Sequence, residues 1–91
     1  MTTALPKDNK GKPDTGYLFE FMPELLEVIK ALELGATKYS RDNYKNVPET
    51  AFRDAAARHL FEIGESDTGN HTAQCVANLL FIMRKRRDNM L

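Results

Sequence analysis

The side chains of this chain that are most suited to chemistry lie in the stretch 58–78. Both histidines, His59 and His71, fall within it, and two carboxylates, Glu65 and Asp67, lie between them beside a glycine-containing turn. Imidazole and carboxylate groups that come together can hold a divalent metal ion, and such an ion can in turn bind phosphates. If the chain is an enzyme, we expect its chemistry in this stretch.

Two helices joined by a short turn are expected to position these side chains. Pro48 favours the start of one helix, whose apolar residues recur along one stripe, and Gly64 is expected to end it. A further helix is predicted from about His71 to Asp88 by its apolar periodicity. Because the link between them is only about six residues long, the two helices should be antiparallel neighbours.

This pairing is expected to place His59 and Glu62 near His71 and Asn78. Each polar residue also has a plain structural interpretation. His59 could be a hydrogen-bonded core histidine, Asn78 a buried amide that fixes helix register, and Asp67 the cap of the following helix. His71 could lie in an exposed first turn.

The N-terminal half is expected to hold an arm and one more helix. Residues 1–16 are rich in charged residues, glycine and proline, and are expected to form a flexible N-terminal arm, with residues 17–91 forming a single all-α domain. Residues 17–22 are apolar and aromatic, which predicts a short lead-in packed on the core. A helix is predicted from Pro23 to Gly35, followed by a connection up to Val47 in which residues 36–39 could form another short turn.

Composition narrows the functional class. The 91 residues carry 13 basic and 13 acidic side chains, so zero net charge argues against indiscriminate nucleic-acid binding. The basic block 84–87 is either a solvated helix end or a phosphate contact. A single cysteine and the lack of a membrane-length apolar stretch predict a protein of the cytoplasm that binds no membrane.

The last helix predicts self-association. Its segment 75–83 is apolar nearly all round, apart from Asn78, so more than one side of it must be covered. One small chain with so few helices can hardly cover it. We therefore expect an all-α, three-to-four-helix domain that assembles into an oligomeric helical bundle, as a dimer or tetramer.

Short motifs follow one another along nearly the whole chain. They are Gly11-Lys12-Pro13, Pro23-Glu24-Leu25-Leu26-Glu27-Val28, Gly35-Ala36 with Lys38-Tyr39, Asn43-Tyr44, Arg58-His59-Leu60, Gly64-Glu65, Asp67, Gly69, His71 and Asn78. Together they resemble a phage and prophage family of dATP/dGTP diphosphohydrolase domains, which is similar to the all-α MazG-like nucleotide pyrophosphohydrolases. The resemblance extends over residues 9–84.

The resemblance implies an oligomeric enzyme that depends on Mg²⁺ or Mn²⁺ and acts in the cytoplasm of an infected bacterial host. Its substrate would be a purine (deoxy)nucleoside triphosphate, hydrolysed to the monophosphate and pyrophosphate. The implied metal ligands are His59, Glu65, Asp67 and His71, and the implied catalytic residues are Glu65, Glu62 and His59. The implied nucleotide contacts are Lys38, Tyr39, Asn43, Arg58 and Asn78.

Two other functions stay open. Gln74 stands where the family often has a second histidine, and Asn78 stands where MazG-like relatives have an acidic residue. The chain could therefore be an inactive phage protein on the same fold, which sequesters a nucleotide or signalling molecule or binds a host protein to counter defence. A small helical protein that binds nucleic acid through residues 84–87 is the third alternative.

Overall fold

The structure is a computed structural model, which describes residues 11–64, 67 and 69–90. These residues form α1 (Gly16–Glu20), α2 (Met22–Lys38), a short 3₁₀ helix η1 (Asn43–Asn46), α3 (Glu49–Glu62) and α4 (His71–Met90). No β-strand occurs in the described ranges, which confirms the all-α prediction. None of the helices described is long and apolar enough to cross a membrane.

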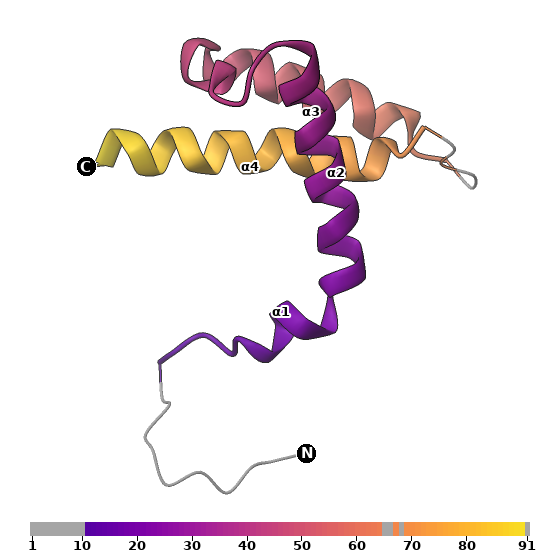
Figure 1. Ribbon diagram of the computed structural model, residues 1–91, viewed down its shortest axis with the longest axis vertical. Helices are drawn as coiled ribbons and strands as arrows, with labels where there is room; N and C mark the ends of the chain where they lie inside the picture. Colours follow the sequence, from indigo (N-terminus) through magenta and orange to yellow (C-terminus); the bar gives the residue numbers. More distant parts are fainter. Residues whose placement is uncertain (1–10, 65–66, 68, 91) are drawn as a thin grey trace, which may run out of the picture.

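Helices α3 and α4 lie side by side, and α2 crosses them near its C-terminal end (Figure 1). The N-terminal half of α2 leaves the α3–α4 pair at a steep angle and carries α1 away from it. Pro48 precedes α3 in an extended conformation, and Ile63 ends the helix by returning to extended backbone. The predicted antiparallel pairing of α3 with α4 is therefore present, and it places the two histidines at the same end of the pair.

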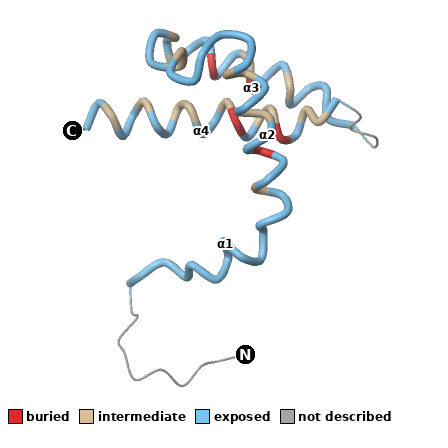
Figure 2. Tube along the Cα trace, in the orientation of Figure 1, coloured by how far each residue is buried: buried red, intermediate tan, exposed pale blue. Residues whose placement is uncertain are grey.

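Small side chains form the contact between α2 and α4. Val28, Ala73 and Ala77 are buried together, with Ala31 and Leu32 packed against them. Alanine lets helix backbones approach closely, so the buried positions gather where α2 crosses the other helices (Figure 2). This places the middle of α2 beside the N-terminal half of α4.

The predicted end of the helix at Gly35 is wrong, because α2 continues to Lys38. A glycine ends a helix when it adopts a left-handed conformation, and among the described glycines only Gly11 has a positive φ. Gly35 stays helical, and its carbonyl accepts a hydrogen bond from the amide of Tyr39 at 3.2 Å. The extra turn brings Lys38 and Tyr39 towards α3 and α4.

The lead-in predicted to pack on the core does not do so. Residues 16–20 form α1, which has no buried residue. Tyr17 stacks on Phe21, with ring centroids 6.3 Å apart, but both rings remain exposed. The apolar character of this segment therefore has no partner within the described part of the chain.

Candidate functional site

A cavity of about 590 Å³ lies between the C-terminal end of α2, η1 and the facing sides of α3 and α4. Its volume is within the range of about 300–1,000 Å³ that is typical of small-molecule sites. Its lining includes all five of the predicted nucleotide contacts, although they come from four separate parts of the chain. They are Lys38, Tyr39, Asn43, Arg58 and Asn78.

The lining combines positive charge with amide groups and an apolar wall. Lys38, Arg41 and Arg58 supply the charge, whereas Ala55, Ala77 and Phe81 are among the apolar residues. A surface of this kind suits a ligand that has both an anionic group and a flat apolar part.

Sequence reasoning missed four polar residues of this lining: Ser40, Arg41, Tyr44 and Gln74. Arg41 had a usable signal, because it lies three positions after Lys38 in the same turn-rich segment. Gln74 lies one helical turn before Asn78 on α4. Its backbone carbonyl accepts a hydrogen bond from the side-chain Nδ2 of Asn78 at 2.8 Å. This contact fixes the orientation of the Asn78 side chain towards the cavity wall.

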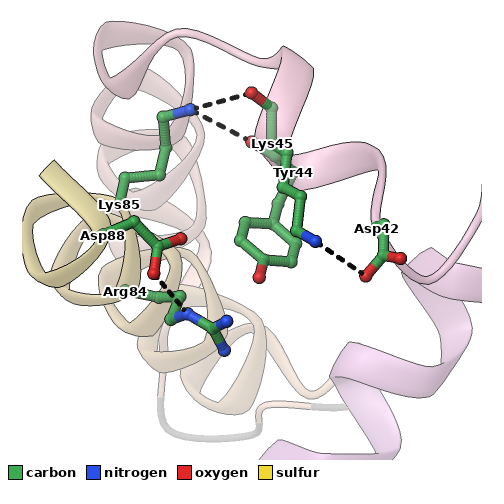
Figure 3. Close-up of polar contacts among 6 residues, drawn as sticks. All are labelled: Asp42, Tyr44, Lys45, Arg84, Lys85 and Asp88. Atoms are coloured by element: carbon green, nitrogen blue, oxygen red, sulfur yellow. Dashed lines mark hydrogen bonds and ion pairs between the residues drawn. The ribbon is translucent and has the colours of Figure 1, made fainter. Parts of the chain in front are cut away.

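Helix α4 holds η1 in place and so forms one wall of the cavity. The Lys85 ammonium donates hydrogen bonds to the backbone carbonyls of Tyr44 and Lys45, both at 3.3 Å (Figure 3). The Tyr44 ring stacks on Phe81 with centroids 5.3 Å apart, and Phe81 stacks on Phe52 at 4.9 Å. These stacked rings join η1, α3 and α4 into one unit.

Three of the four residues in the basic block 84–87 have partners within the chain. Arg84 lies over the Tyr44 ring, with its guanidinium carbon 5.7 Å from the ring centroid, and it also pairs with Asp88 at 3.0 Å. Arg86 donates two hydrogen bonds to the Glu49 carboxylate, at 2.9 and 2.8 Å. Much of this block therefore serves the packing of η1 and α3 on α4, which weakens the nucleic-acid alternative.

His59 and His71 meet where α3 and α4 come together. Their Nδ1 atoms are 2.9 Å apart, so one ring donates a hydrogen bond and the other accepts it. Burial lowers the pKa of His59, and the neighbouring His71 lowers it further. The lowered pKa favours the neutral ring of His59, which is the member of the pair that lines the cavity.

Asp67 caps α4, as one of its two interpretations predicted. Its Oδ1 accepts a hydrogen bond from the His71 amide at 2.7 Å, and its Oδ2 accepts from the amide and the hydroxyl of Thr72, both at 2.7 Å. These hydrogen bonds lower the pKa of Asp67 because they favour the carboxylate. The cap fixes the first turn of α4 and thereby the position of His71.

Gly69 leaves room for the His71 ring. A β-carbon built at position 69 would lie only 2.7 Å from the Nε2 atom of His71. Because the His71 ring is also hydrogen-bonded to His59, it has little freedom to move aside. The turn before α4 therefore depends on glycine at this position.

Comparison with known protein families gives a match over residues 2–90 to the family described as dATP/dGTP diphosphohydrolase, N-terminal. The chain belongs to this family. No curated protein and no solved structure matches the chain. The family match spans η1 and all four α-helices, so the cavity lies wholly within the dATP/dGTP diphosphohydrolase N-terminal domain.

The structure describes only some of the four predicted metal ligands of this diphosphohydrolase domain. Glu65 lies outside the described residues, and Asp67 is engaged in capping α4. Within the ranges 11–64, 67 and 69–90, no group of three or more His, Cys, Asp or Glu residues could hold a metal ion. Mg²⁺ and Mn²⁺ prefer oxygen ligands. The donors described at this point, His59 and His71, therefore do not fit either ion by themselves.

The predicted catalytic residues separate in the structure. His59 lines the cavity, whereas Glu62 is exposed at the C-terminal end of α3 and is not part of the lining. The roles of these residues and of Glu65 in catalysis stay predictions, as does the metal role of His59, Glu65, Asp67 and His71.

Proposed function

We propose that this chain binds a purine deoxynucleoside triphosphate in the 590 Å³ cavity and hydrolyses it to the monophosphate and pyrophosphate, with Mg²⁺ or Mn²⁺ as cofactor. The observation that carries the proposal is the common location of the five residues that the family resemblance implies for nucleotide contact. They range from Lys38 to Asn78 in the sequence, yet they line one cavity. Membership of the dATP/dGTP diphosphohydrolase family supports this choice of substrate.

The triphosphate would lie against the basic part of the lining. Lys38, Arg41 and Arg58 come from α2, the following loop and α3, and together they offer positive charge to several phosphate oxygens. The Tyr39 side chain is 73% exposed, so it can stack on a purine without losing any internal packing. The amides of Asn43 and Asn78 would then meet polar atoms of the base or sugar.

The proposed reaction breaks the P–O bond between the α- and β-phosphates. Water adds to the α-phosphorus, and pyrophosphate leaves with the bonding electron pair. A general base must take the proton from this water, and neutral His59 is suited to the role because it lines the cavity. This role requires the tautomer in which His59 Nδ1 donates its hydrogen to His71 Nδ1, because Nε2 is then the nitrogen that accepts the proton. Glu62 and Glu65 are the other predicted candidates for this base.

The test is a panel of dNTPs and NTPs incubated with the purified chain and Mg²⁺ or Mn²⁺, followed by chromatography of the products. We expect dATP or dGTP to give the monophosphate and pyrophosphate, and a chelator to abolish the product. Monophosphate that forms equally well in the presence of chelator would contradict the metal requirement. A nucleotide that is retained but recovered intact would instead favour the sequestering alternative.

A matched pair of variants ties the activity to the cavity. Arg58→Ala should raise the KM for the triphosphate by at least tenfold, because an arginine that meets a phosphate is worth about 1.5–3 kcal/mol. Arg53→Ala is the control, since Arg53 is an exposed arginine on the same helix and does not line the cavity. Equal KM values for the two variants would place the substrate elsewhere.

A further inference from the structure

The N-terminal arm of the structure, which is α1 with the start of α2 (residues 16–26) and not the predicted flexible segment 1–16, presents an apolar surface that has no partner within the described ranges. Phe19 is 71% exposed and Tyr17 61%, and α1 has no buried residue. Glu20 is the only charged residue of α1. The large apolar side chains exposed on the arm are Tyr17, Leu18, Phe19, Phe21, Met22 and Leu26.

A second unpartnered surface lies in the angle between α2 and the C-terminal half of α4. This concave face holds a cavity of about 710 Å³. Apolar residues of α2 and α4 line it, among them Ile29, Leu32 and Leu80. Its charged rim has three basic residues, Arg41, Lys45 and Arg84, against the two acidic residues Glu33 and Asp42.

The arm cannot fill the concave face of its own chain. It is joined to that face by α2, a continuous helix of 17 residues whose only proline is at its N-terminal end. Figure 1 shows that α2 holds α1 well away from α4. A helix without an internal break does not fold back on itself, so the two apolar surfaces stay apart within one copy.

The described helices leave many large apolar side chains exposed, whereas monomeric soluble proteins rarely expose a contiguous apolar patch of more than a few hundred Å². Of the described hydrophobic residues, only Val28, Phe52, Ala56, Ala73 and Ala77 are buried.

We propose that the arm packs into the concave face of a second copy of this chain, and that the two copies exchange arms reciprocally. Each copy carries both an apolar arm and an apolar hollow, which is the self-complementary arrangement that a two-fold dimer needs. Of the three basic rim residues, Lys45 and Arg84 already pair with Asp42 and Asp88, and Arg41 also lines the 590 Å³ cavity, so the proposed contact rests on the apolar side chains. The exchange covers α1, the first turns of α2 and Leu80, which one copy leaves exposed.

The test is the molecular mass in solution, measured by light scattering after size exclusion. Phe19→Glu should reduce the assembly to the monomer mass, because it places a charge in the proposed interface and disturbs no buried contact of its own chain. Phe61→Glu is the matched control, since Phe61 is 90% exposed on α3 and lines neither cavity. It should keep the mass of the unmodified chain.

A monomer mass for the unmodified chain at tens of micromolar would overturn the proposal, as would an unchanged mass for Phe19→Glu. Dissociation of Phe61→Glu alone would also overturn it, by placing the interface on α3. Circular dichroism checks that each variant remains helical. These measurements use mass and not hydrolysis, so their outcome is independent of the proposed enzymatic function.

Hydrogen exchange on the unmodified chain gives a second measurement that needs no variant. Amides of residues 16–26 should exchange more slowly at high protein concentration than after dilution. Equal exchange of this segment at both concentrations, while the mass changes from dimer to monomer, would show that the arm is not in the interface.

Discussion

Two regions of the molecule differ in what holds them in place: the unit formed by α3, α4 and η1, and the N-terminal arm. Interactions between different elements hold the first region together: Lys85 reaches η1, Arg86 reaches α3, and His59 meets His71. The interactions described for the arm join near neighbours in sequence, such as Tyr17 stacked on Phe21. One copy of the chain therefore suffices to shape the 590 Å³ cavity, whereas the position of the arm must depend on what covers it.

The largest difference between the two regions should come from the same substitution made in each. Phe81→Ala removes a ring that stacks on both Tyr44 and Phe52, so it should lower the free energy of unfolding by about 2–4 kcal/mol. Phe19→Ala should change it by less than about 0.5 kcal/mol, measured by urea unfolding at a concentration where the chain is monomeric. Equal losses of unfolding free energy in the two variants would contradict the difference between the two regions.

A smaller effect should follow when η1 is released from α4. Lys85→Met keeps the aliphatic stem but removes both hydrogen bonds to the carbonyls of Tyr44 and Lys45, which should cost about 1 kcal/mol of unfolding free energy. Because η1 forms a wall of the cavity, nucleotide affinity should also fall. Arg87→Met is the control on the same helix, and isothermal titration with the nucleotide compares the two. The same affinity in both variants would show that the lysine does not shape the cavity.

Acid should loosen the junction of α3 and α4 in two steps. The pKa of His59 is lowered from 6.5, so the unfolded chain binds more protons than the folded one just below that pH, and stability falls as the pH drops through this window. The pKa of Asp67 is lowered from 3.8, so its stabilising effect is present above that value and is lost as the pH falls further. Urea midpoints across this pH range should show both losses. His59→Gln should remove the first and keep the second.

The smallest effect is expected at the outer surface of the same region. Arg86 and Glu49 form a bidentate ion pair, but both side chains are well exposed. Water and salt weaken such exposed pairs. Arg86→Gln should therefore shift the urea midpoint only slightly, and the shift should shrink further in high salt. A large, salt-independent loss would mean that this pair matters more to the α3–α4 unit than its exposure indicates.

The sequence predicted the parts of the fold that local patterns determine. Pro48 marked the start of α3, and the carboxylate of Asp67 marked the start of α4. The short link predicted that the histidines would meet. The length of α2 could not be predicted in this way, because a glycine near a helix end is compatible both with ending the helix and with continuing it, as Gly35 does.

The partners of the basic block were beyond the reach of local patterns. Lys85 meets carbonyls about 40 positions earlier in the chain, and Arg86 meets Glu49 at a similar separation. Such contacts depend on how α4 lies against α3 and η1, which periodicity does not specify. The same reason explains the exposure of α1: its apolar residues indicate that they need a partner but not whether the partner belongs to the same chain.

Gly69 has a consequence for how this protein can diverge. Any side chain at that position would press on the His71 ring, and a displaced ring would lose its hydrogen bond to His59. Sequence drift in this turn is therefore coupled to the imidazole pair, although position 69 itself binds nothing in the cavity. Homologues that keep both histidines should keep a glycine here, and those that have lost one of them should be free to replace it.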